Sequence, residues 1–192
     1  MNTIIIILLD ESGSMEDSKD EVLKSVNDFI TNQKSVKDDN AKLYLLTFNS
    51  FVKTLYSGVP LEDIPLLTEN DYQPNGFTAL YDAIAEGVNQ AEKNKNKEDR
   101  VICVIITDGE ENSSRKTTLT DIKKIITKQE ATNEWSFVYI GKDPDSWKIN
   151  SGTKSNNSVG YDTPDSINHT SNPIINFRKT NLTQSNHIFN YN

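Results

Sequence analysis

The sequence predicts an α/β fold of the Rossmann-like type: a doubly wound, mostly parallel sheet of about six strands, with one antiparallel edge strand and helices on both faces. Three apolar runs, 4–9, 43–48 and 101–106, are continuous rather than alternating. Such runs are typical of strands that are covered on both sides. Segments with apolar residues at helical spacing separate them, and this alternation of strand and helix favours a parallel sheet.

The remaining elements are expected in the same alternating order. A turn at Asn49-Ser50 predicts that strands 41–48 and 51–56 form a hairpin, which supplies the antiparallel edge strand. Apolar periodicity predicts the helices, and short apolar runs before glycine or polar residues predict the last strands. The expected helices are 15–33, 78–93 and 118–130, with short ones within 60–67 and 145–149, and the expected later strands are 101–107, 135–140 and 159–161.

Periodicity fades beyond about residue 163, where polar residues and asparagine dominate. We therefore divide the chain into a domain at 1–162 and a polar, Asn-rich C-terminal extension at 163–192. The extension is expected to be weakly structured, with a few apolar residues that could anchor it to the domain.

Composition narrows the classes of function. The net charge of −8 does not favour nucleic-acid binding, which needs clustered basic residues. The N-terminal apolar run is too short for a membrane span or a signal segment, so we expect no membrane contact. The only cysteine, Cys103, lies inside an apolar run and is expected to be a packing residue. A chain with one cysteine cannot form an internal disulfide, which favours a cytoplasmic location.

Polar residues follow two of the predicted strands and precede one helix. They are Asp10, Ser12 and Ser14 after the first strand, Thr78 before the helix that follows, and Asp108 after the strand at 101–107. Because ligand sites in open α/β sheets lie beyond the carboxyl ends of strands, we expect these side chains to converge. All of them offer oxygen, and the two histidines, His169 and His187, lie in the extension. Oxygen ligands suit Mg²⁺, with Mn²⁺ and Ca²⁺ as alternatives, rather than Zn²⁺.

These residues resemble a known family. Asp10-x-Ser12-x-Ser14 is similar to the D-x-S-x-S motif of von Willebrand factor A-type and integrin I domains, and 76–84 and 106–109 are similar to that family's second and third elements. The resemblance covers roughly residues 3–162. It implies a metal-ion-dependent adhesion site in which Ser12 and Ser14 bind the metal directly and Thr78 binds it directly or through water. Asp10 and Asp108 are implied to hold metal-bound waters and the serine hydroxyls, and a carboxylate of a partner protein is implied to take the sixth position.

The resulting hypothesis is a protein that is not an enzyme but a divalent-cation-dependent protein–protein interaction module, whose Mg²⁺ takes an Asp or Glu from its partner. One alternative is a Mg²⁺-dependent phosphatase of the haloacid-dehalogenase-like type, although Ser12 stands where that class needs an acid. Another alternative is a scaffold whose metal site is vestigial.

Three further features of the sequence bear on the site. The hydroxyls of Ser12, Ser14 and Thr78 could simply cap helices. Phe77 stands where the family commonly has a small residue, and we expect it to affect access to the metal. No closing C-terminal helix is recognisable in 163–192.

Overall fold

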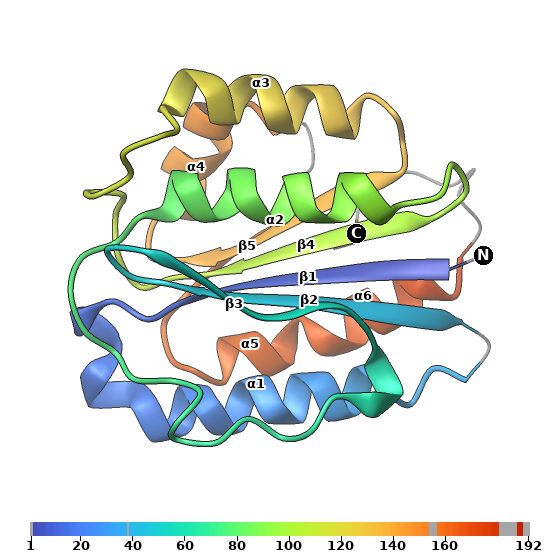
Figure 1. The fold of residues 1–192 in the computed structure, drawn as a ribbon, viewed down its shortest axis with the longest axis horizontal. Coiled ribbons are helices and arrows are strands. Elements are labelled where there is room, and N and C mark those ends of the chain that lie inside the picture. Colours follow the sequence, from blue (N-terminus) through green and yellow to red (C-terminus); the bar gives the residue numbers. More distant parts are fainter. Residues whose placement is uncertain (1, 38, 154–156, 181–187, 190–192) are drawn as a thin grey trace.

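The computed structural model describes residues 2–37, 39–153, 157–180, 188 and 189. They form one six-stranded sheet in the order β3-β2-β1-β4-β5-β6 (Figure 1). All neighbouring strands run parallel except β2 and β3, which form an antiparallel hairpin. The predicted fold class is therefore confirmed. The strands are β1 (Asn2–Asp10), β2 (Asn40–Phe48), β3 (Val52–Pro60), β4 (Arg100–Ile106), β5 (Trp135–Gly141) and β6 (Ser158–Gly160).

Helices cover both faces of the sheet, with α2, α3 and α4 on one face and α1, α5 and α6 on the other (Figure 1). Their bounds are α1 (Lys19–Gln33), α2 (Leu80–Asn94), α3 (Leu119–Glu130), α4 (Pro144–Ser151), α5 (Ser166–His169) and α6 (Ser171–Arg178). The 3₁₀ helices are η1 (Gly13–Ser18) and η2 (Leu61–Asp63). The helix expected from Met15 thus begins with a 3₁₀ segment and becomes α-helical at Lys19.

The central strand β1 shows why its sequence is a continuous apolar run. Successive side chains of a strand point to opposite faces. Ile5, Ile7 and Leu9 pack in the core on the α1 side, whereas the alternate residues Ile4, Ile6 and Leu8 pack in the core on the α2 side. Both faces are buried, so every position from 4 to 9 is apolar.

Residues 164–180 are more regularly structured than the weakly structured extension that the sequence predicts. Helices α5 and α6 lie against α1 on the sheet, and Ile167 and Ile174 are fully buried in the core beneath them (Figure 1). Ile188 is also buried, and its N–H donates to Asn157 Oδ1 at 2.7 Å. His187 lies outside the described residues. Among the described helices, none has the length and apolar character needed to cross a membrane.

Two buried arginines fasten α6 to the rest of the domain. The guanidinium of Arg100, at the start of β4, donates to the carbonyls of Phe177 and Thr180, the latter at 2.8 Å. Arg178, within α6, donates to the Gln33 carbonyl at 2.7 Å and pairs with Asp39 at 2.8 Å. These bonds join α6 to residues far earlier in the chain, so local sequence patterns do not predict them.

Candidate metal site

The first part of the site is the loop that follows β1. Asp10 is the last residue of β1, and its side chain is fully buried. One carboxylate oxygen accepts the backbone N–H of Ser12 at 2.7 Å, and the other accepts the hydroxyl of Thr107 at 2.5 Å. Asp10 is therefore held rigidly between the end of β1 and the end of β4.

The hydroxyls of Ser12 and Ser14 lie side by side, with their oxygens 3.1 Å apart. The Ser14 hydroxyl donates to Asp108 Oδ1 at 2.6 Å, which links the loop after β1 to the loop after β4. Ser12 is buried, whereas Ser14 is exposed and Asp108 is partly exposed. The two serine hydroxyls thus extend from the buried Ser12 to the surface at Ser14.

Gly109 shows how closely Thr78 approaches the other residues. A Cβ atom placed on Gly109 would lie 3.5 Å from Thr78 Oγ1, 3.8 Å from Ser14 Oγ and 3.9 Å from Asp10 Oδ2. Three oxygens from two separate segments therefore surround the space beside Gly109, which lies in a third segment, the loop after β4. The structure thus brings together all five side chains that the sequence nominates.

The hydroxyls do not serve as helix caps. Ser12 precedes η1 but its side chain makes no capping hydrogen bond, and the residue before α2 is Ala79 rather than Thr78. Within the described part of the chain, the Thr78 hydroxyl has no hydrogen-bond partner. The interpretation of these residues as caps is therefore wrong, and their oxygens are not bound to helix ends.

Backbone hydrogen bonds fix the three segments relative to one another. The N–H of Gly13 donates to the Gly76 carbonyl at 3.1 Å, and the N–H of Asn112 donates to the Thr78 carbonyl at 3.0 Å. The Asn112 side chain accepts the Thr78 N–H at 2.8 Å in return. The positions of the site oxygens therefore follow from the fold itself.

Glu111 has a role that sequence reasoning missed. Its carboxylate accepts hydrogen bonds from Tyr81 N at 2.9 Å, Ser113 N at 2.8 Å and Ser114 N at 2.7 Å. The Ser114 hydroxyl adds a further bond at 2.7 Å. Glu111 therefore anchors the loop after β4 to the N-terminal turn of α2. The two serines that follow it at short spacing were the available signal.

Asp82, in the first turn of α2, holds the next stretch of the same loop. Its carboxylate accepts the backbone N–H groups of Arg115 at 2.9 Å and Lys116 at 3.1 Å. Burial alone would raise the pKa of Asp82, but these bonds and others from Thr117 lower the pKa overall. Asp82 thus positions the loop and lies outside the ring of site oxygens.

The charges in the site suit a cation. Burial raises the pKa of Asp10 above its ordinary value, hydrogen bonds from Thr107 and Ser12 oppose this, and the nearby charge of Asp108 raises it further. A bound cation would relieve this repulsion between the two carboxylates. Within the described residues, no group of three His, Cys, Asp or Glu side chains could hold a metal. The donor set is therefore two carboxylates with hydroxyls, which fits a hard cation that keeps some of its waters.

Comparison with known proteins identifies the family. The model of the von Willebrand factor type A domain matches residues 5–159. Proximal thread matrix protein 1 from the mussel byssus has a TM-score of 0.64 and 17% identity, over 91% of this chain and 47% of that one. A von Willebrand factor type A protein from Catenulispora acidiphila has a TM-score of 0.64 and 14% identity, over 91% of this chain and 42% of that one. The PilB minor pilin from Streptococcus sanguinis has a TM-score of 0.67 and 13% identity, over 92% of this chain and 61% of that one.

The present chain thus spans less than two thirds of each of these three structures. At these identities they show a shared fold. One structure of the byssus protein has a zinc-occupied MIDAS (metal-ion-dependent adhesion site) motif. No curated protein matches the sequence. The family model covers most of the chain, and the chain belongs to the von Willebrand factor type A domain family.

Proposed function

We propose that this domain is a divalent-cation-dependent protein interaction module. The observation that carries the proposal is the convergence of Asp10, Ser12, Ser14, Thr78 and Asp108 around the space beside Gly109. Domains of this family are typically interaction modules, and none of these five residues is a histidine. The proposal therefore assigns binding rather than catalysis to the site.

The residues divide into two groups. The hydroxyls of Ser12, Ser14 and Thr78 would hold the metal, and the carboxylates of Asp10 and Asp108 would orient those hydroxyls and the metal's waters. With few charged ligands in direct contact, a bound cation keeps a strong attraction for an outside anion. We propose that this anion is an Asp or Glu side chain of a partner protein.

Mg²⁺ is the proposed metal because all the available donors are oxygens and because Mg²⁺ tolerates sites in which several waters remain bound. Mn²⁺ and Ca²⁺ share the preference for oxygen and are the alternatives. The zinc reported in a byssus protein of the same fold supports a divalent cation in general. Direct titration distinguishes these metals.

Isothermal titration of EDTA-treated protein with Mg²⁺ and Mn²⁺ tests the metal site. We expect one site in the unaltered chain, and a loss of at least tenfold in affinity for Ser14→Ala and Thr78→Ala. Thr120→Ala is the matched control, because Thr120 is an exposed threonine on α3. Circular dichroism checks that each variant is folded. Equal Mg²⁺ affinity in all four proteins would contradict the proposal.

We also propose that the protein acts in the cytoplasm, with neither nucleic acid nor membrane as its partner. Cys103 is fully buried in β4, and burial raises the pKa of its thiol, so it is protected from reaction. A single cysteine offers no internal disulfide for an oxidising compartment. Fractionation of source cells checks this, and recovery only in the secreted fraction would contradict it.

A further inference from the structure

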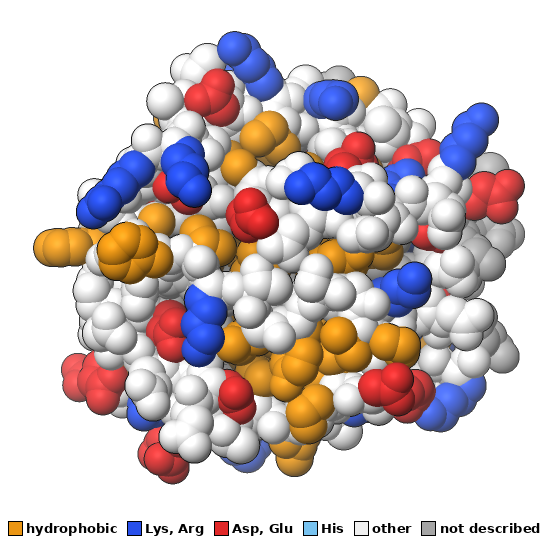
Figure 2. Space-filling model, viewed as in Figure 1, with side chains coloured by type: hydrophobic (Ala, Val, Ile, Leu, Met, Phe, Trp, Pro, Cys, Tyr) orange, Lys and Arg blue, Asp and Glu red, His pale blue; other side chains and the backbone are white. Residues whose placement is uncertain are grey.

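The surface beside the candidate metal site carries an unusual pair of exposed aromatic residues. Phe51, in the turn between β2 and β3, has 68% of its surface exposed, and Phe77, next to Thr78, has 65% exposed. The Ser50 hydroxyl accepts the backbone N–H of Phe77 at 3.0 Å, which holds the two segments together. We call Phe51 and Phe77 the aromatic edge. Figure 2 shows hydrophobic side chains on this side of the molecule, at the left, with basic side chains close above them.

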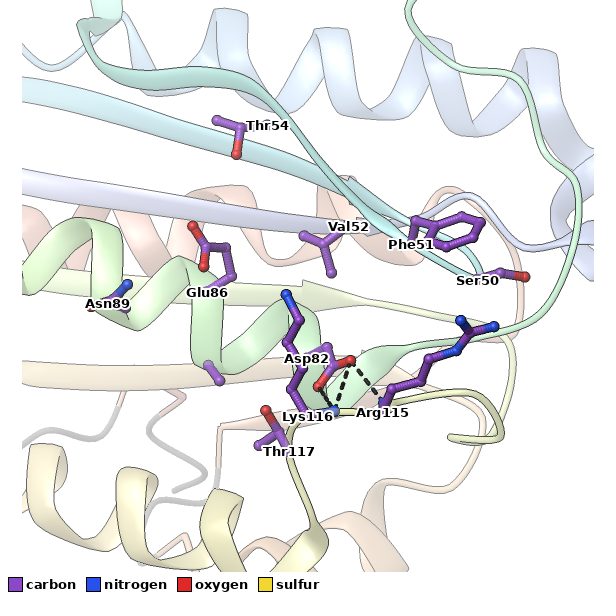
Figure 3. Close-up of a pocket in the computed structure, with 11 residues that line it drawn as sticks. Ser50, Phe51, Val52, Thr54, Asp82, Glu86, Asn89, Arg115, Lys116 and Thr117 are labelled. Atoms are coloured by element: carbon purple, nitrogen blue, oxygen red, sulfur yellow. Dashed lines mark hydrogen bonds between the residues drawn. The ribbon is translucent and has the colours of Figure 1, made fainter.

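A groove of about 590 Å³ opens beside the aromatic edge, between β3, α2 and the loop after β4 (Figure 3). Phe51 and Val52 line one side, and Arg115 and Lys116 line the other. We call this the lateral groove. In Figure 3 the Arg115 side chain extends toward Phe51, and its guanidinium carbon lies 5.6 Å from the centre of the Phe51 ring. The groove therefore joins an aromatic surface to a cationic one.

Four charged side chains line the lateral groove, namely the carboxylates of Asp82 and Glu86 and the cations of Arg115 and Lys116. The Asp82 carboxylate is occupied by the backbone N–H groups of Arg115 and Lys116, as the dashed lines in Figure 3 show. Glu86 accepts the side-chain amide of Gln90 at 2.8 Å. In the described part of the chain, neither Arg115 nor Lys116 forms an ion pair. The two carboxylates are thus engaged by donors of this chain, whereas the two cations form no ion pair, so an acidic ligand would make its contact in this groove at Arg115 and Lys116.

The aromatic edge and the candidate metal site are directly continuous. Phe77 precedes Thr78 in the chain, and Ala79 donates its N–H to the Asn49 carbonyl at 2.8 Å, which places the Phe51 turn beside the start of α2. An extended ligand that leaves the metal site on this side would therefore cross Phe77 and then Phe51 before it reaches Arg115.

We propose that the partner segment whose carboxylate reaches the metal site continues over the aromatic edge into the lateral groove, where it places an apolar side chain on Phe51 and Phe77 and a second acidic side chain on Arg115 and Lys116. This inference rests on the proposed function and extends it, because it names the partner's chemistry. The partner is an extended acidic segment in which a carboxylate, an apolar side chain and a second carboxylate stand at alternate positions, because alternate side chains of an extended chain face the same surface. Phe51 and Arg115 are the residues that determine this specificity, since contacts of this kind concentrate at aromatic and arginine side chains.

The test is a selection from a random peptide library displayed on phage, with the full chain immobilised in Mg²⁺ and bound phage eluted with EDTA. We expect the eluted peptides to share an acidic, an apolar and a second acidic residue at alternate positions. Synthetic peptides of that sequence should bind Phe51→Ala and Arg115→Gln roughly tenfold more weakly, with Mg²⁺ affinity unchanged. Leu66→Ala and Lys124→Gln are the matched controls, because both residues are exposed and lie outside the lateral groove.

The outcomes separate the two proposals. If EDTA-eluted peptides bind Phe51→Ala and Arg115→Gln as tightly as they bind the controls, or if they lack a second acidic residue, the lateral groove is not the docking surface and the proposed function stands. If no peptide is eluted by EDTA and the chain shows no Mg²⁺ binding by titration, the proposed function fails, and this inference fails with it.

Discussion

Substitution of Ile174 by alanine tests whether the C-terminal helices belong to the folded domain. Ile174 is fully buried in α6, in the core on the α1 side of the sheet. Replacing a buried isoleucine with alanine removes buried apolar surface and leaves a cavity, at a cost of about 2–5 kcal/mol. We expect about 3 kcal/mol here, and a melting temperature lower by about 6–12 °C, since a chain of this size loses about 2–4 °C per kcal/mol.

Ile149→Ala is the control for this substitution, because Ile149 has 75% of its surface exposed and the chemical change is identical. We expect its free energy of unfolding to stay within about 0.5 kcal/mol of that of the unaltered chain. Urea unfolding followed by circular dichroism measures both variants, with the m-value showing whether the denatured state has changed. If Ile174→Ala unfolds at the same urea concentration as Ile149→Ala, α6 contributes nothing to the core, and the chain would tolerate truncation after residue 162.

Three other changes test the packing and the site. The pKa of Asp82 is lowered in the folded chain, so its ionised carboxylate stabilises the folded state. Compared with Asp82→Asn, the unaltered chain should have its full advantage in free energy of unfolding above the ordinary aspartate pKa of about 3.9. That advantage should disappear as the pH falls through the lower pKa of the folded state. Urea unfolding at several pH values measures this, and a difference independent of pH would contradict it. Gly109→Ala places a methyl group among the site oxygens and should weaken Mg²⁺ binding at least tenfold without changing the melting temperature. An unchanged Mg²⁺ affinity in titration would show that the metal binds at another place. Arg100→Lys loses the two hydrogen bonds to the Phe177 and Thr180 carbonyls and should lower the free energy of unfolding by about 2–3 kcal/mol, measured with urea. A decrease of less than about 0.5 kcal/mol would show that these two bonds are not needed for stability.

The sheet and its helices were predictable because their signals are local. The run at 4–9 indicates a strand buried on both faces, and periodic apolar residues indicate α2 and α3. Helix α6 is different, because it spans only Ser171–Arg178 and contains Pro173 and two asparagines. Its stability comes from contacts with Arg100 and Gln33, which are distant in sequence. A helix held by such contacts gives little signal of its own.

The site was predictable to a similar extent and for a similar reason. Its five residues lie at strand ends or just before a helix, and the sheet's topology brings such positions together. The serines after Glu111 could have indicated its local bonds, but its bond to Tyr81 was not predictable, because it depends on the N-terminal turn of α2 lying against the loop after β4. The position of Phe77 beside Phe51 depends on the hydrogen bond to Ser50, which no sequence pattern indicates.

The hydrogen bonds around the site bear on how metal and folding are related. The loops that carry Asp10, Thr78 and Asp108 are joined by backbone bonds, such as those from Gly13 to Gly76 and from Asn112 to Thr78. If these backbone bonds hold the site without a metal, a bound metal would stabilise the folded state only by mass action, by about 2.7 kcal/mol at a concentration one hundred times its dissociation constant. Chelation should therefore abolish partner binding and leave a cooperatively folded domain. Loss of cooperative unfolding in EDTA would instead show that the metal organises the loops.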